Sequence, residues 1–292
     1  MLINKLNWIS SSNASPDLLK DLDSQMSRFY ATLDQRQGYQ ELNDELHDVE
    51  DHPNNRLAGQ LAEFIITSGF TKVLEVGCGS GRIYAHLKKR AFKGSYTGVE
   101  MADYVIRSNR EKYPEASWET GSAYDLERYK NSFDCCFSFY VLEHLIYPEK
   151  GLISMLNTVR VGGALVLLFP DFVRIGIVPS QKIGMRYGAG AKEKLKKGRL
   201  LDAVISYWEA GMMRSKLKRI NKRFGNFVIN CKPYCLDKEC NILLPDFDAV
   251  YLGHKKEIEN WACQLGHRVI YPLGKEGLLA KNAYMAIFKN GK

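Results

Sequence analysis

The stretch that decides the fold is Val73-Leu74-Glu75-Val76-Gly77-Cys78-Gly79-Ser80-Gly81-Arg82. An apolar run is followed by three glycines at alternate positions, and a helical pattern starts at the final arginine. Glycine adopts positive φ angles readily and lets the backbone approach a ligand closely. The free amide groups at the start of a helix can bind a ligand's polar atoms. The sequence therefore predicts a strand, a ligand-binding turn and a helix.

The alternation of strand and helix continues outward from this turn. Strands are predicted at 72–76, 95–100, 117–120, 134–139 and 164–169, and helices at 54–68, 82–90, 104–112 and 149–160. Val161-Gly162-Gly163 is expected to end the last of these helices. A helix at 255–265 and two strands at 268–272 and 283–288 complete the pattern, the strands joined by turns as an antiparallel pair requires. This predicts a doubly wound α/β fold, Rossmann-like, with a seven-stranded, mostly parallel sheet.

Three parts are expected along the 292 residues. Residues 1–52 form a helical, acidic N-terminal extension, 53–170 and 251–292 form the sheet domain, and 171–250 form a partly helical insertion after strand five. We expect the insertion above the carboxyl ends of the strands, where open α/β sheets bind ligands. The longest apolar run, 164–169, is too short to span a bilayer, and the N-terminus lacks the layout of a secretory signal. We therefore expect a cytoplasmic protein.

A carboxylate, Glu100, ends the predicted strand at 95–100. An acid at this place can accept hydrogen bonds from both ribose hydroxyls of an adenosine. The glycine turn alone also suits a dinucleotide, whose pattern is G-x-G-x-x-G. Here Arg82 stands where the third glycine should be, which disfavours a dinucleotide.

Together, the glycine turn, the acidic strand end and the stretch 134–145 resemble class I S-adenosylmethionine-dependent methyltransferases. The nearest type is the ubiquinone- and menaquinone-biosynthesis (type 11) group, and the resemblance covers 55–170 and 253–290. It implies S-adenosylmethionine as the cofactor and S-adenosylhomocysteine as the product. The residues that it assigns to the cofactor are Glu75, Gly77, Cys78, Gly79 and Gly81 (methionine part), Glu100 (ribose), Met101, Ser122 and Ala123 (adenine), and Tyr140. The family often has an acid where this chain has Ser122, which weakens the expected adenine contact.

A base would assist methyl transfer to a hydroxyl. His144, after strand four, is the best-placed candidate, and a loop histidine that caps a helix or contacts the cofactor is the alternative. Asp171, after strand five, is the second candidate. Tyr30, His47 and His52 lie on the N-terminal extension and are expected to be lid or surface residues.

Seven cysteines include Cys231, Cys235 and Cys240, spaced C-x3-C-x4-C. Zinc pairs are usually spaced C-x2-C, and no fourth ligand is close in sequence. We therefore expect free thiols and no metal.

The segment 182–223 carries 13 basic and three acidic residues, a net of +10 against +8 for the whole chain. Within it, apolar residues recur at helical spacing (Leu201, Val204, Ile205, Trp208 and Met212), and we expect this stripe to pack on the sheet domain. The surrounding charge indicates an anionic small-molecule acceptor, such as a metabolite, glycan or lipid precursor, methylated on oxygen or nitrogen, or contact with a membrane surface. The alternative is a methyltransferase that acts on RNA or protein through this insertion. The intact glycine turn argues against a non-catalytic protein, and the oligomeric state is not predicted.

Overall fold

The computed structural model describes residues 6–34, 53–181, 191–220, 227–237, 246–273 and 282–291. Its central sheet has seven strands in the order β4-β3-β2-β5-β6-β9-β8. The strands are β2 (Lys72–Val76), β3 (Ser95–Glu100), β4 (Ser117–Thr120), β5 (Phe133–Phe139), β6 (Val159–Pro170), β8 (Arg268–Ile270) and β9 (Asn282–Phe288). Only β9 runs against both of its neighbours. The predicted Rossmann-like sheet is confirmed.

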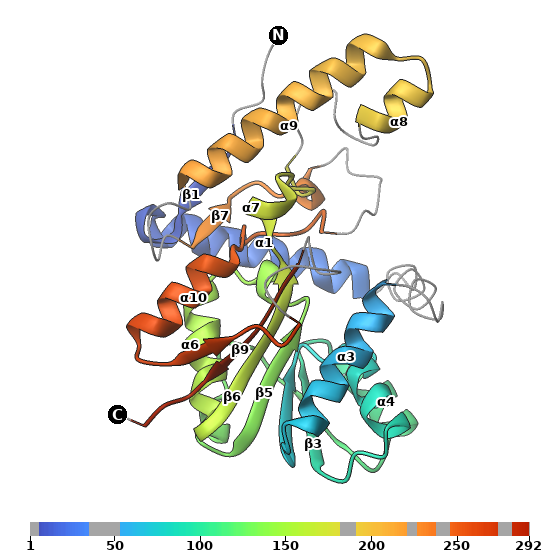
Figure 1. The fold of residues 1–292 in the computed structure, drawn as a ribbon, viewed down its shortest axis with the longest axis vertical. Helices are drawn as coiled ribbons and strands as arrows, with labels where there is room; N and C mark the ends of the chain where they lie inside the picture. The colour runs from blue at the N-terminus through green and yellow to red at the C-terminus, as the bar shows by residue number, and fades with distance from the viewer. Residues whose placement is uncertain are drawn as a thin grey trace.

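Helices cover both faces of this sheet because its buried strands are apolar on both sides (Figure 1). The helices α3 (Pro53–Thr67), α4 (Arg82–Lys89) and α5 (Asp103–Lys112) pack on one face, and α6 (Pro148–Thr158) and α10 (Lys255–Gln264) on the other. Successive residues of β6 alternate between the two cores: Leu165 and Leu167 belong to the α6–α10 side, Val166 and Leu168 to the α3–α5 side. Period-two alternation thus builds two cores on one sheet.

The junction between α6 and β6 differs from the prediction. Helix α6 ends at Thr158, and the two glycines expected to stop it lie inside β6, which begins at Val159. Val159 already pairs with Phe133, and the register of β5 against β6 shifts between Phe133 and Cys135. Gly162 has a φ of +82°. The glycines therefore accommodate a bulged strand start rather than a helix end.

The N-terminal extension and the insertion join in a second, two-stranded sheet. Strand β1 (Trp8–Ser10) pairs antiparallel with β7 (Val228–Asn230), more than two hundred residues along the chain. Helix α1 (Pro16–Asp34) follows β1 and lies between the central sheet and the long helix α9 (Leu200–Ile220) (Figure 1). Its buried residues, Leu19, Leu22 and Met26, belong to the α6–α10 core. Residues 6–34, the described part of the extension, are therefore packed into the fold.

The insertion also contains α7 (Phe172–Ile175) and α8 (Ala191–Lys196), and it has a small core of its own. The expected packing of the α9 stripe is wrong: Leu201, Val204 and Trp208 are 80%, 67% and 50% exposed. A different face of α9 is buried, and it carries Ala203, Ser206, Glu209, Met213 and Leu217. In the described ranges, no helix has both the length and the apolar character needed to cross a membrane.

Candidate cofactor and acceptor site

The glycine turn between β2 and α4 has the backbone that its sequence predicts. Gly77, Gly79 and Gly81 have φ angles of +72°, +46° and +76°. The amides of Gly77 and Cys78 both donate to the carbonyl oxygen of Val99, at 2.8 and 3.1 Å, which ties the turn to β3. A Cβ at Gly77 would overlap Val141, whereas a Cβ at Gly79 would meet nothing within 4 Å. The turn is thus packed on one side and open on the other.

Two residues that sequence analysis missed hold this turn from behind. Asn109 of α5, 2% exposed, donates its side-chain amide to the carbonyl oxygen of Gly79 at 2.7 Å. The ring of Trp118 lies where a Cβ at Gly81 or Gly98 would have to be. Asn109 interrupts the apolar face formed by Val105 and Ile106. A polar residue on a buried helix face was the signal available in the sequence.

Two carboxylates lie behind the turn, at β2 and β3. Glu100 accepts hydrogen bonds from the backbone amides of Met101 at 2.8 Å and Gly79 at 3.2 Å. Glu75, 2% exposed, accepts from the Tyr96 hydroxyl at 2.5 Å. Burial raises the pKa of Glu75 to about 8, the Tyr96 hydrogen bond opposes this shift, and the charge of Glu100 adds to it. With a pKa of about 8, Glu75 is mostly protonated at neutral pH, and a cationic ligand beside it would favour its ionised form.

The residues assigned to the adenine lie beside Glu100. Met101 is 58% exposed. The amide of Gly121 donates to the carbonyl oxygen of Glu100 at 2.9 Å, which brings the 121–123 loop next to this strand end. The Ser122 hydroxyl accepts from the Tyr124 amide at 3.2 Å, and Ala123 packs against the α6–α10 core. The structure brings these three predicted residues to the same edge of the sheet as the glycine turn.

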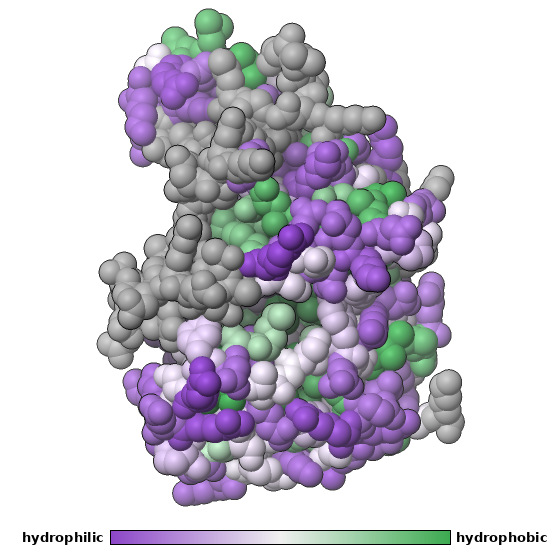
Figure 2. All heavy atoms as spheres, turned by 180° about the vertical axis from the view of Figure 1, so that it is seen from behind, coloured by the Kyte–Doolittle hydropathy of each residue, from purple (hydrophilic) through white to green (hydrophobic). Residues whose placement is uncertain are grey.

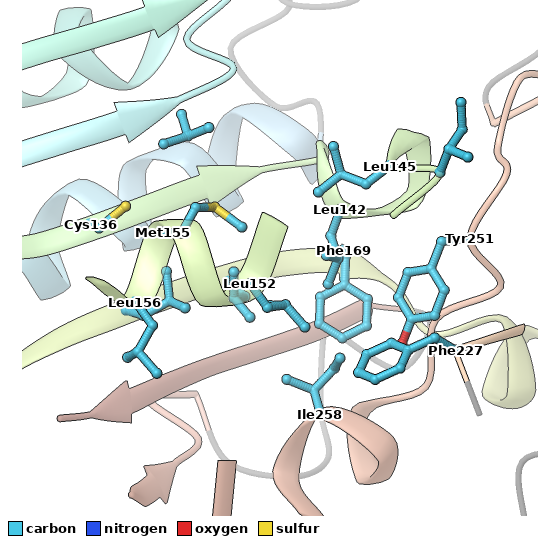
Figure 3. Close-up of a cluster of buried hydrophobic side chains, with 14 of the residues drawn as sticks. Cys136, Leu142, Leu145, Leu152, Met155, Leu156, Phe169, Phe227, Tyr251 and Ile258 are labelled. Carbon is cyan, nitrogen blue, oxygen red and sulfur yellow. The ribbon is translucent and has the colours of Figure 1, made fainter. Parts of the chain in front are cut away.

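The loop after β5 closes the other side of the turn. Tyr140 has a φ of +56°, a conformation that costs energy for a non-glycine residue, and such strain clusters at functional sites. Leu142 and Leu145 are buried in the α6–α10 core near Phe169 and Tyr251 (Figure 3). These two leucines flank Glu143 and His144 in sequence and so fix the short helix η3 (Leu142–His144). The strained backbone at Tyr140 is therefore held in place by the buried leucines that follow it.

His144 sits in a network that reaches three segments of the chain. Its Nδ1 lies 3.2 Å from the Tyr30 hydroxyl of α1 and 3.4 Å from Asp248 Oδ2. The same Tyr30 hydroxyl lies 3.2 Å from Asp248 Oδ2. The imidazole is 25% exposed, so one side of it can be reached. Tyr30, expected on a lid or surface, instead orients the candidate base, while His47 and His52 lie outside the described residues.

Three acids surround this histidine. Burial opposes protonation of His144, but the charges of Asp248, Glu143 and Asp246 outweigh it and raise the pKa above 6.5. Burial also raises the pKa of Glu143 to about 8 and that of Asp246 to about 6. Both carboxylate oxygens of Glu143 are buried without a hydrogen-bond partner among the described residues. Asp246 and Asp248 were missed, because they lie more than a hundred residues from His144 in sequence.

Asp171 has a different environment. It is fully buried, and its Oδ1 accepts a hydrogen bond from the Arg174 amide at 3.1 Å, which caps α7. His254 Nδ1 lies 2.9 Å from the same oxygen. These contacts are typical of a structural carboxylate that joins α7 to the start of α10.

The cysteines do not form a metal centre in the described ranges. The thiol of Cys235 is buried and donates to Met26 Sδ at 3.7 Å, and Cys231 is half-buried. Cys240 lies outside the described residues. Across those residues, no group of three or more His, Cys, Asp or Glu side chains is arranged to hold a metal ion.

Comparison with known proteins connects this geometry to a family. Residues 74–167 match a family model described as "Methyltransferase domain". An uncharacterized methyltransferase from Schizosaccharomyces pombe is 28% identical over 121 residues, 38% of this chain and 44% of the relative. The mitochondrial ubiquinone biosynthesis O-methyltransferase of Candida albicans is 29% identical over 118 residues, 37% of this chain and 36% of the relative. The chain thus spans less than half the length of these curated relatives.

A solved structure from Thermotoga maritima, titled as a SAM-dependent methyltransferase and possible histamine N-methyltransferase, covers 90% of this chain and 100% of its own. It has a TM-score of 0.51 and 13% identity, so the likeness concerns the fold alone. The family match falls on β2 to β6, the strands that carry the glycine turn, Glu100 and the η3 loop. Residues 74–167 therefore belong to a class I, S-adenosylmethionine-dependent methyltransferase domain of the type 11 group.

Proposed function

We propose that the whole chain is an S-adenosylmethionine-dependent methyltransferase that methylates an oxygen or nitrogen atom of a small molecule. The observation that carries this proposal is the glycine turn facing Glu100 across β2 and β3, with the η3 loop closing the other side.

The residues at this turn fit the cofactor by charge and by shape. S-adenosylmethionine carries an ammonium and a sulfonium, and a cation lowers the cost of the buried Glu75 charge. The open side of Gly79 leaves room for close approach, and Glu100 can accept from ribose hydroxyls. We assign the turn and Glu75 to the methionine part, Glu100 to the ribose, and Met101, Ser122 and Ala123 to the adenine. Tyr140 would pack against the bound molecule from the η3 side.

The bound cofactor supplies an activated methyl group, so the chain mostly has to align an acceptor and exclude water. His144 is the candidate group to take the acceptor proton, because its ring is partly exposed and Tyr30 and Asp248 fix its orientation. The surrounding acids stabilise the imidazolium that proton transfer would create. Asp171 is the weaker candidate, because it is fully buried and caps a helix.

The acidic residues around His144 change the charge that we expect the acceptor to carry. The carboxylates of Asp246 and Asp248 repel an anion, whereas the basic residues on α8 and α9 lie beyond α1 from the sheet (Figure 1). We therefore favour an acceptor that is neutral or cationic at the methylated end. An anionic group would have to lie toward the insertion.

Cofactor binding is tested by calorimetry with Glu100→Ala. Loss of charge-assisted hydrogen bonds should cost about 1.5–3 kcal/mol per contact, which is a loss of affinity of about tenfold or more. Asp103→Ala is the matched control, because Asp103 is an exposed acid near Glu100 that pairs with Arg107. Equal affinities for wild type and Glu100→Ala would remove Glu100 from the site.

The base is tested by labelled methyl transfer into fractionated metabolite extracts. His144→Ala should lower turnover while leaving cofactor affinity close to wild type. For the wild type, kcat/KM should rise with pH through a pKa above 6.5, since only the neutral imidazole accepts a proton. Asp248→Asn should move that limb to lower pH, because a charge that raises the pKa is removed. An unmoved limb would exclude His144. Salt-sensitive binding and methylation of RNA would instead support the RNA alternative.

A further inference from the structure

The hairpin formed by α8 and α9 is built to hold its shape. Gly198, in the turn between the helices, has a φ of +71°. Lys194, 2% exposed, donates its ammonium to the Ser206 hydroxyl at 2.8 Å and so links α8 to α9. Arg199 pairs with Asp202 at 2.6 Å in the first turn of α9. The outward side chains of this hairpin are therefore presented by a fixed scaffold.

Large apolar side chains cover the outward face. Six of the eleven exposed large hydrophobic residues in the described chain lie here: Leu195, Leu200, Leu201, Val204, Tyr207 and Trp208. The five on α9 are spaced i, i+1, i+4, i+7 and i+8, which places them on one side of the helix. Their exposed fractions run from 50% for Trp208 to 80% for Leu201. Contiguous apolar surface of this kind marks an interaction site.

Helix α9 therefore has two apolar faces, one exposed and one buried in the protein. Met213 and Leu217, which are 2% and 0% exposed, pack into the insertion's own core. The hairpin is thus already anchored before its outward face is used. In Figure 2, hydrophobic side chains lie beside hydrophilic ones at the upper end of the molecule, where Figure 1 places this hairpin.

Basic side chains border the apolar face. Lys192, Lys196, Lys197 and Arg199 are exposed on α8 and the turn, and Arg214, Lys218 and Arg219 are exposed further along α9. The one acid of the first turn of α9, Asp202, is engaged by Arg199. A helix with exposed leucines and an aromatic pair on one side, surrounded by lysines, has the composition of an interfacial helix at an anionic bilayer surface.

We propose that the α8–α9 hairpin docks this protein on anionic phospholipid membranes. Leu195, Leu200, Leu201 and Val204 enter the boundary between headgroups and acyl chains, Tyr207 and Trp208 lie at the level of the headgroups, and the lysines contact lipid phosphates. The proposal goes beyond the methyltransferase function and does not depend on it.

Two other possible partners, a second copy of this chain and RNA, fit this surface less well. A second copy in a two-fold interface would bring two like-charged basic borders together, which costs binding energy. RNA would pair with the lysines, but exposed aliphatic side chains such as Leu201 and Val204 have no partner on a nucleic acid, whose proteins use aromatic and basic surfaces.

The test is sedimentation of the full chain with phosphatidylcholine vesicles, with and without phosphatidylglycerol. We expect binding only to the anionic vesicles, weakened by added salt. Leu201→Ser with Val204→Ser should reduce the partition coefficient by about tenfold or more, because two aliphatic side chains no longer enter the lipid. Val161→Ser, at an equally exposed valine of β6, is the matched control and should bind as wild type does.

Charge is tested separately with Lys196→Glu and Lys197→Glu against Lys93→Glu, an exposed lysine before β3. The first pair should abolish binding to anionic vesicles, and the control should retain most of it. Circular dichroism confirms that each variant is folded. Equal binding to neutral and anionic vesicles would overturn the proposal. So would a dimer that the serine variants make monomeric while vesicles stay unbound, or RNA binding that the serine variants leave intact in the absence of vesicle binding.

Discussion

One added methyl group should be far more costly at Gly77 than at Gly79. Both glycines have positive φ angles, +72° and +46°. A Cβ at Gly77 would also overlap the side chain of Val141 on the η3 loop, whereas a Cβ at Gly79 would have no neighbour within 4 Å. The two alanine variants therefore share a backbone cost, and only one of them adds a steric cost.

The magnitudes follow from these two contributions. Holding a non-glycine residue in the left-handed region costs about 1–2 kcal/mol. Overpacking by one methyl group costs about 1–3 kcal/mol. Gly79→Ala should therefore lower the free energy of unfolding by about 1–2 kcal/mol, and Gly77→Ala by about 2–5 kcal/mol.

Urea denaturation of both variants measures these costs, and a double-mutant cycle isolates the contact. In a Val141→Ala background, Gly77→Ala should cost about as little as Gly79→Ala, because the overlapping methyl groups are gone. Calorimetry with S-adenosylmethionine adds an independent readout, in which Gly79→Ala weakens binding although it destabilises the fold less than Gly77→Ala does. The reasoning is refuted if Gly77→Ala is no more destabilising than Gly79→Ala, or if Val141→Ala does not relieve it.

Three further outcomes are expected. Burial raises the pKa of Glu75 from 4.5 to about 8, so the free energy of unfolding should fall as pH rises from about 4.5 to 8, by at most about 5 kcal/mol. Denaturation measured against pH should show a flatter dependence for Glu75→Gln. Asp171→Ala should lower the free energy of unfolding by about 2–4 kcal/mol in urea titrations, because the α7 cap and the His254 contact are both lost, and near-native stability would contradict the assigned role. Tyr124→Phe should cost about 1–3 kcal/mol, because the backbone amides of the loop before α6 lose their acceptor, and a calorimetric melting temperature within error of wild type would exclude this.

The sheet could be predicted closely because its signals are local. The bounds predicted for β2, β3 and β4 agree with the structure residue for residue. Each of these strands is a short run with a glycine directly beside one of its ends (Gly77, Gly94 and Gly121), so no distant partner is needed to recognise it. The fold class followed because strand and helix alternate with connections that only a parallel sheet accommodates.

What sequence analysis missed depends on distant contacts. Strand β1 has only three residues and becomes a strand because β7 pairs with it. The contact of Tyr30 with His144 joins residues 114 positions apart. The α9 stripe was assigned to the wrong face because that helix carries apolar residues on two sides, and periodicity alone does not indicate which side meets the protein.

The pairing of β1 with β7 has a consequence for how such a chain can change over evolution or in the laboratory. The N-terminal segment and the insertion both lie outside the central sheet, and they are joined to each other by backbone pairing although more than two hundred residues separate them in the sequence. If the insertion were grafted into a relative without the N-terminal segment, the three residues of β7 would lose the strand that they pair with. The N-terminal segment and the insertion are therefore expected to change together, and recombination that separates them should yield chains that fold poorly.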